Sequence, residues 1–195
     1  RAKPLYWLGE TEDAAYLDVF DSWYTWRWMS ATEKYCRHEK TMAELLQVQE
    51  NYKNNFPSDD LGAFFTTNHD ENSWNGTEYE KFGHAAKALA VFSCTRKGNP
   101  LIYSGQELPN RKRLKFFDKD PIEWIGNNEM HDFYKTLLTL HKQHPALRAG
   151  DSSVSTYRLK TNRDDKIFAF LRKNGNAEVL VLLNLSAEHN VGFII

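Results

Sequence analysis

The feature that most constrains the fold of this chain is a regular alternation of strand-like and helix-like segments up to about residue 148. Short apolar runs of strand length lie at residues 5–9, 61–67 and 100–103, and residues 22–28 are a further strand candidate. Helical periodicity marks residues 41–56, 77–95 and 130–141. Strands that alternate with helices in this way predict parallel βαβ units, because the helix returns the chain to the same edge of the sheet.

The starts and faces of the predicted helices are visible in the sequence. Thr41 with Glu44, and Thr77 with Glu80, have the T-x-x-E form of a capping box, in which two side chains satisfy exposed backbone N–H groups. The third helix has one apolar face. Its members lie at i, i+3, i+4, i+7, i+8 and i+11: Met130, Phe133, Tyr134, Leu137, Leu138 and His141.

The pattern changes after Pro145 and Gly150. Four β-rich runs follow, separated by Asn, Asp and Gly turns, at residues 154–159, 167–171, 179–185 and 191–195. They predict an antiparallel module. We therefore expect two parts, an α/β region over residues 1–149 and a partial all-β domain over residues 150–195.

Composition excludes several classes of protein. The 25 Lys and Arg residues balance 26 Asp and Glu residues, and this net charge of −1 argues against a nucleic-acid partner. No window approaches the roughly 18 apolar residues of a membrane-spanning helix. Cys36 and Cys94 lack the spacing of a zinc site. The aromatic content of 14% leaves many flat side chains that can pack in a core or stack on sugars.

Polar residues follow three of the strand candidates directly. Glu10 ends the first run, Asn68-His69-Asp70 follows the run at 61–67, and Gln106-Glu107 follows the run at 100–103. The C-terminal ends of parallel strands meet at one edge, where α/β proteins place their sites. Repeated carboxylates there favour acid/base chemistry. Taken singly, each carboxylate is better explained as a solvated loop residue or a helix cap, and His69 as a structural histidine.

Two segments resemble motifs of a known family. Phe64-Phe65-Thr66-Thr67-Asn68-His69-Asp70 resembles the F-x-x-N-H-D motif that ends the seventh barrel strand in the α-amylase family, glycoside hydrolase family 13. Gly98-Asn99-Pro100-Leu101-Ile102-Tyr103-Ser104-Gly105-Gln106-Glu107 resembles its G-x-P-x-I-Y-x-G-x-E segment at the eighth strand. The segment 5–10 is similar to the fifth-strand segment, and His144-Pro145-Ala146-Leu147 matches family usage after the last barrel helix.

The resemblance covers essentially the whole chain and implies a fold. Residues 1–149 would be the C-terminal half of a (β/α)8 TIM barrel, from the fifth to the eighth strand. Residues 150–195 would begin an antiparallel β-sandwich-type domain. The resemblance also implies a partner, an α-glucan oligo- or polysaccharide, and a secreted, periplasmic or cell-surface location.

Residue roles follow from the same resemblance. Glu10 would be the general acid/base, and Asp70 the carboxylate that stabilises the transition state. His69 and Asn68 would bind the sugar, and Trp74 is the aromatic residue that we place nearest to substrate. Glu12, two residues beyond Glu10, is the alternative candidate for the general acid/base.

The sequence also predicts the surroundings of these residues. An apolar setting of Tyr6, Trp7 and Leu8 around Glu10 would favour its protonated form. The aromatic residues at 23, 24, 26 and 28 are expected to belong to the core rather than to a sugar-stacking platform. For residues 116–120 a packed loop with a solvated charge pair is favoured over a lining of the mouth.

The implied activity is that of a retaining hydrolase of α-1,4-glucosidic bonds in starch-like glucans. The family's nucleophile, an aspartate at the end of the fourth strand, is expected upstream of Arg1, so this chain should be inactive alone. No cofactor or metal is expected within it, and the resemblance allows calcium in the full-length enzyme. Open strand edges predict self-association. The alternatives are a glucosyltransferase, an α-1,6 or disaccharide hydrolase, and a non-catalytic carbohydrate-binding relative.

Overall fold

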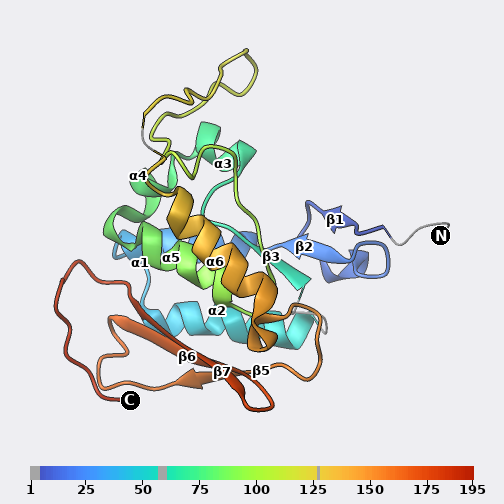
Figure 1. The fold of residues 1–195 in the computed structure, drawn as a ribbon, viewed down its shortest axis with the longest axis vertical. Helices are drawn as coiled ribbons and strands as arrows, with labels where there is room; N and C mark the ends of the chain where they lie inside the picture. The colour runs from blue at the N-terminus through green and yellow to red at the C-terminus, as the bar shows by residue number, and fades with distance from the viewer. Residues whose placement is uncertain (1–4, 57–60, 127) are drawn as a thin grey trace.

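The computed structural model describes residues 5–56, 61–126 and 128–195, which form a parallel and an antiparallel sheet with helices packed between and around them (Figure 1). The first sheet has four strands in the order β1-β2-β3-β4, and the second has three in the order β5-β6-β7. In chain order the elements are β1 (Leu8–Gly9), the 3-10 helix η1 (Ala14–Tyr16), β2 (Ser22–Tyr24), α1 (Trp26–Cys36), α2 (Met42–Asn55), β3 (Gly62–Phe64), α3 (His69–Trp74), α4 (Glu78–Phe82), η3 (Gly83–Ala85), α5 (Ala86–Thr95), β4 (Asn99–Pro100), α6 (His131–Gln143), η4 (Pro145–Leu147), β5 (Ser155–Leu159), β6 (Ile167–Asn174) and β7 (Ala177–Asn184).

All pairings in the first sheet are parallel, as the alternation of segments predicts. Each strand lies beside the next one along the chain, so β1 pairs with β2, β2 with β3, and β3 with β4. Successive parallel strands joined through helices are the arrangement of a (β/α)8 barrel, of which four strands make half. The C-terminal ends of the strands therefore meet at one edge.

The close approach of β4 to β3 depends on a glycine. Gly98, just before β4, has φ +139°, and a Cβ on it would lie 2.4 Å from the carbonyl oxygen of Gly62 in β3. Any other residue would combine a strained backbone with a steric clash. Gly98 thus lets the chain enter the sheet directly beside β3.

Both predicted capping boxes are confirmed, and one predicted helix is divided. The Thr41 and Glu44 side chains cap α2, and those of Thr77 and Glu80 cap α4. The continuous helix expected over 77–95 is instead α4, η3 and α5. Gly83 sits at the break with φ +52°, where glycine is tolerated and most residues are strained. Periodicity continues across this break and so conceals it.

The segment at 22–28 changes type partway. Only Ser22–Tyr24 is strand, and an eleven-residue helix that the sequence did not predict, α1, begins at Trp26. Two of its first three residues, Trp26 and Trp28, have low helix propensity, and tertiary packing overrides this preference. The aromatic residues of this segment belong to the core, as expected. Trp23 and Trp28 are 1% and 2% exposed, and Tyr24 is 7% exposed.

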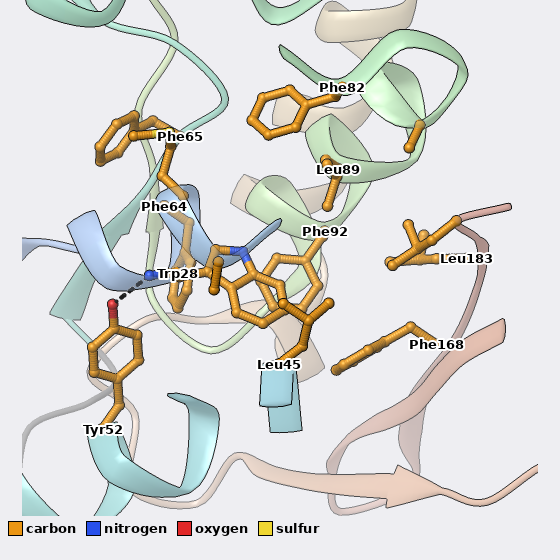
Figure 2. Close-up of a cluster of buried hydrophobic side chains, with 14 of the residues drawn as sticks. Trp28, Leu45, Tyr52, Phe64, Phe65, Phe82, Leu89, Phe92, Phe168 and Leu183 are labelled. Atoms are coloured by element: carbon orange, nitrogen blue, oxygen red, sulfur yellow. Dashed lines mark hydrogen bonds between the residues drawn. The ribbon is translucent and has the colours of Figure 1, made fainter. Parts of the chain in front are cut away.

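One hydrophobic core joins both sheets through the helices (Figure 2). The Trp28 ring stacks on Phe92 of α5, with centroids 4.3 Å apart, and Phe92 meets Phe168 of β6 at 5.6 Å. The backbone N–H of Trp28 donates to the Tyr52 hydroxyl oxygen at 2.9 Å. Each such side chain, fully buried, contributes about 1.5–3 kcal/mol. The antiparallel sheet is therefore packed directly against the helices that cover the parallel one.

The buried strand predicted at the start of the chain is shorter and more exposed than expected. Only Leu8–Gly9 forms β1, and Leu5, Tyr6, Trp7 and Leu8 are 41–59% exposed. The physical reason is the position of β1: it is an outer strand of the four-stranded sheet, with β2 as its neighbour. Its apolar side chains consequently lack a packing surface on the other side among the described residues.

The antiparallel module is confirmed in three of its four predicted strands. β6 and β7 form a hairpin whose turn contains Gly175 at φ +59°. The fourth predicted strand, at 191–195, is wrong. This segment makes two hydrogen bonds, between the backbone of Ile194 and Asn162, and these do not extend into a ladder. The division into residues 1–149 and 150–195 stays a prediction, although the change from parallel to antiparallel sheet lies between β4 and β5.

Candidate active site

Three of the predicted site side chains converge at the C-terminal edge of the parallel sheet. The His69 Nε2 atom lies 3.5 Å from Asp70 Oδ1 and 4.0 Å from Glu10 Oε1. One oxygen of each carboxylate and the imidazole nitrogen all lie within 4.8 Å of one another. Glu10 follows β1, whereas His69 and Asp70 begin α3 beyond β3. The fold thus joins residues that are 59 or more positions apart in the sequence, and a ligand can reach them from solvent.

Asn68 determines where α3 begins. Its side-chain oxygen accepts the backbone N–H groups of Asp70 at 3.1 Å and Glu71 at 2.8 Å, while its own backbone stays extended. This is an N-cap, which satisfies amides that have no partner inside the helix. Asn68 is 1% exposed, so in this structure it positions its neighbours. Its direct contact with a sugar stays a prediction.

Tyr24 is a site neighbour that the sequence reasoning assigned only to the core. It is the last residue of β2, between the strands that carry Glu10 and His69. Burial raises the pKa of its hydroxyl, and the negative charges of Glu10 and Asp70 raise that pKa further. In the sequence Tyr24 lies inside the strand candidate at 22–28, and only the structure places it at the end of a strand.

The apolar enclosure predicted for Glu10 is not formed by the residues that the structure describes. Tyr6, Trp7 and Leu8 are themselves exposed, and the Glu10 side chain is 45% exposed. The reason is again that β1 is an outer strand. An enclosure of Glu10 would require packing against another part of the protein.

Glu12, the rival acid, has a structural role. Its carboxylate accepts a hydrogen bond from the Tyr52 hydroxyl and from the Arg27 backbone N–H, and its side chain is 10% exposed. Burial raises the pKa of Glu12, and those hydrogen bonds act against the rise. Glu12 therefore links the start of α1 to α2, and its oxygens are already engaged.

Trp74 belongs to an exposed aromatic cluster, which we define as Trp74, Phe116 and Phe117. Its ring centroid lies 5.0 Å from Phe116 and 5.8 Å from Phe117, and Phe116 is 6.5 Å from the His69 ring. The two phenylalanines come from the long segment between β4 and α6, which extends beyond α3 at the top of Figure 1. A hollow of about 350 Å³ lies between Trp74 and this segment. The packed loop predicted at 116–120 is thus an aromatic surface beside the candidate site.

Asn72 holds that segment in place. Its side-chain amide donates to the Lys112 carbonyl oxygen at 3.2 Å, and its oxygen accepts the Leu114 N–H at 2.8 Å. Asn72 is 2% exposed and sits on α3 between His69 and Trp74. One short helix therefore carries the polar site residues and also anchors the aromatic cluster.

A buried ion pair supports α3 from the core side. Lys81 Nζ lies 2.9 Å from Glu71 Oε2, and the two side chains are 0% and 14% exposed. The Asn75 side-chain amide donates to Glu71 and to the buried Glu33. Burial lowers the pKa of Lys81, and the neighbouring carboxylates act against this. Nothing in the local sequence of α4 distinguishes Lys81 from a solvated lysine.

Gln106 and Glu107 form a separate, structural group. The Gln106 side chain donates to Thr66 and Tyr134 and accepts the Tyr103 N–H, and it is 2% exposed. Glu107 accepts the Gly105 N–H. These contacts shape the turn after β4. The third polar cluster predicted at a strand end therefore supports the edge and stays apart from the Glu10–His69–Asp70 group.

Calcium does not fit the Glu10–His69–Asp70 group. Within residues 5–56, 61–126 and 128–195, the one grouping of three or more His, Cys, Asp or Glu side chains with converging ligand atoms is Glu10, His69 and Asp70. Calcium takes six to eight oxygen ligands, whereas this group offers an imidazole nitrogen. Calcium in a longer protein stays a prediction.

No helix in the described part is long and apolar enough to cross a membrane.

The chain is similar in sequence to an α-amylase and to a 1,4-α-glucan branching enzyme. It is 30% identical over 135 residues to the α-amylase MalA of Haloarcula japonica. The aligned region covers 68% of this chain and 19% of that protein. It is 26% identical over 191 residues to the 1,4-α-glucan branching enzyme GlgB of Bacillus cytotoxicus, covering 84% of this chain and 28% of that protein. The chain thus spans less than a third of the length of these relatives. A scan against models of protein families gives no match.

The fold is also similar to that of solved α-amylase structures. The crystal structure of a maltogenic α-amylase, AmyB, of Thermotoga neapolitana superposes with a TM-score of 0.82 at 20% identity. The match covers 94% of this chain and 42% of that one. At this identity the likeness establishes the fold, and it extends over both sheets of this chain.

Proposed function

Because this chain belongs to the α-amylase family, glycoside hydrolase family 13, we propose that Glu10, His69 and Asp70 are part of the active site of a retaining glycosidase. Its substrate would be an α-1,4-linked, starch-like glucan. The observation that carries the proposal is the convergence of these three side chains within 4.8 Å at the C-terminal edge of a parallel sheet.

Each side chain has a chemical task in this proposal. Glu10 protonates the oxygen of the departing sugar, which is otherwise a poor leaving group. The transition state resembles an oxocarbenium ion, so the ionised Asp70 stabilises its positive charge more strongly than it stabilises the neutral substrate. His69, between the two carboxylates, donates a hydrogen bond to a sugar hydroxyl.

A retaining mechanism also needs a nucleophilic carboxylate about 5–5.5 Å from the acid. Glu12 is unsuited to this task because Tyr52 and Arg27 engage its oxygens. We assign the nucleophile to another segment of the protein, a strand that ends in Arg-x-Asp in the family pattern. These 195 residues alone should consequently cleave no starch.

Glucosyl transfer is the second candidate function, and one observation favours it. The aromatic cluster of Trp74, Phe116 and Phe117 is exposed beside His69, where a sugar acceptor could stack in place of attacking water. The similarity to a branching enzyme, over 84% of this chain, agrees with it. A non-catalytic role is less favoured, because a binding module gains nothing from an acid in the position of Glu10.

Sugar binding by this chain tests the proposal without requiring turnover. We expect maltoheptaose to bind and to quench tryptophan fluorescence, and cellohexaose, with its β-linkages, to bind at least tenfold more weakly. His69→Ala and Trp74→Ala should each weaken maltoheptaose binding about tenfold, equal to about 1.4 kcal/mol. His131→Ala, an exposed histidine at the start of α6, is the matched control and should change nothing. Equal binding of the two sugars would contradict the proposal.

A further inference from the structure

The three site atoms lie within 4.8 Å of one another, and one of their spacings is that of a tetrahedral metal complex. Zinc lies about 2.0–2.2 Å from nitrogen and carboxylate ligands, so two ligands at tetrahedral corners are about 3.4 Å apart. His69 Nε2 is 3.5 Å from Asp70 Oδ1 and 4.0 Å from Glu10 Oε1. The Glu10 oxygen is the one that must move closer, and its side chain is 45% exposed and so has room to rotate toward the other two ligands.

The chemistry of the donors selects among cations. One imidazole nitrogen and two carboxylate oxygens suit Zn²⁺ and its analogue Co²⁺, which accept mixed nitrogen and oxygen ligands in four-coordinate sites. Mg²⁺ and Ca²⁺ prefer oxygen ligands alone, in six or more positions. Three protein ligands leave the fourth corner open to water.

The backbone that carries the ligands is already held in place. Asn68 caps α3 at the position of His69 and Asp70, and the buried pair of Lys81 and Glu71 anchors the same helix. The ligand side chains themselves are 34–51% exposed. A hydrated cation can therefore reach them without opening the fold.

We propose that Glu10, His69 and Asp70 form a three-ligand site for a zinc-type divalent cation, and that a bound cation excludes sugar from the candidate active site. The exclusion follows because the cation uses the same oxygen and nitrogen atoms that the sugar would contact. This cation is an inhibitor and not a cofactor. The binding part of the proposal depends on the geometry alone, and only the exclusion part rests on the proposed function.

Calorimetric titration of the 195-residue chain with Zn²⁺ at pH 7.5 tests the site. We expect one Zn²⁺ per chain and at least tenfold weaker binding in His69→Ala, with no change in His131→Ala. Co²⁺ should give the intense visible absorption of a four-coordinate complex in the unaltered chain and lose it in His69→Ala. The free cysteines are poor competitors, because burial raises the pKa of the Cys36 and Cys94 thiols to about 12 and metals bind thiolates.

Three results would overturn the binding site: wild-type Zn²⁺ affinity in His69→Ala, absence of Zn²⁺ binding, or Ca²⁺ binding as tight as that of Zn²⁺. Because the His69 side chain is 51% exposed, His69→Ala should keep the circular dichroism spectrum of the parent. Should it lose that spectrum, Asp70→Asn takes its place with the same expected loss.

Competition separates this inference from the proposed function. If Zn²⁺ binds and maltoheptaose does not, the metal site stands and the proposed function fails. If maltoheptaose binds and Zn²⁺ does not, the reverse holds. Where both bind, saturating Zn²⁺ should weaken maltoheptaose binding at least tenfold, and an unchanged sugar affinity would overturn the exclusion.

Discussion

Replacing Lys81 by methionine should destabilise the chain strongly, because it removes one partner of a buried ion pair. The Lys81 side chain is 0% exposed and its ammonium lies 2.9 Å from Glu71. Methionine fills a similar volume, so the loss is mainly electrostatic. Removing one partner of a buried pair costs about 3–5 kcal/mol. We expect the lower end, about 3 kcal/mol, because Glu71 is 14% exposed and keeps its hydrogen bond from Asn75.

Urea unfolding followed by circular dichroism at low micromolar concentration measures this loss. For a domain of this size about 3 kcal/mol corresponds to a fall in Tm of about 6–12 °C. The control is Lys53→Met, which removes an exposed pair with Glu50, 3.7 Å apart and with side chains 70% and 54% exposed. That change should stay within about 0.5 kcal/mol.

A double variant tests the assigned cause. Lys81→Met with Glu71→Gln removes the uncompensated charge and should recover about 1–2 kcal/mol of the loss. Hydrogen exchange at the Asn72 and Asn75 amides, which bond within α3, should accelerate in the single variant and less in the double one. A loss below about 1 kcal/mol in Lys81→Met, or a double variant no more stable than the single one, would refute the reasoning.

Four further predictions concern other parts of the molecule. In a longer protein that includes the nucleophile, Asp70→Asn should lower kcat by about 10²–10³-fold with a much smaller change in KM. A near-normal kcat in steady-state assays would show that Asp70 has no catalytic role. Burial raises the pKa of Glu78 above 4.5, so the folded chain holds this proton more tightly than the unfolded chain. The free energy of unfolding should therefore fall as the pH rises from 4.5 through the raised pKa. In Glu78→Gln the urea midpoint should lose that decline, and a pH dependence identical to that of the parent would contradict the assignment. Gly98→Ala should lower the free energy of unfolding by about 2 kcal/mol or more, because its Cβ would lie 2.4 Å from a carbonyl oxygen. Gly83→Ala has open space around it and should lose about 1 kcal/mol in the same urea assay, and equal losses would argue against the clash. The isolated chain should self-associate through the exposed β1 region in sedimentation at micromolar concentration, and a monomer there would disprove this.

Local features of the chain could be predicted because their causes lie within a few residues. The capping boxes at Thr41 and Thr77 need only a hydroxyl and a carboxylate three positions apart. Parallel pairing and the antiparallel module followed from periodicity, which depends on which side chains face a core. By contrast, the α1 helix escaped detection because the tryptophans at its start favour a strand in the sequence, and only packing in the core places them in a helix.

For the site, the sequence by itself determined the residue types and their places at strand ends, because the C-terminal ends of parallel strands share one edge. Only the tertiary structure decided that Glu10 meets His69 and Asp70 while Glu12 turns to Tyr52, since these residues are two positions apart and either could have faced the edge. The support of α3 by Lys81 was decided there as well. A lysine in α4 becomes an anchor only when packing removes water from it, and that depends on every element around it.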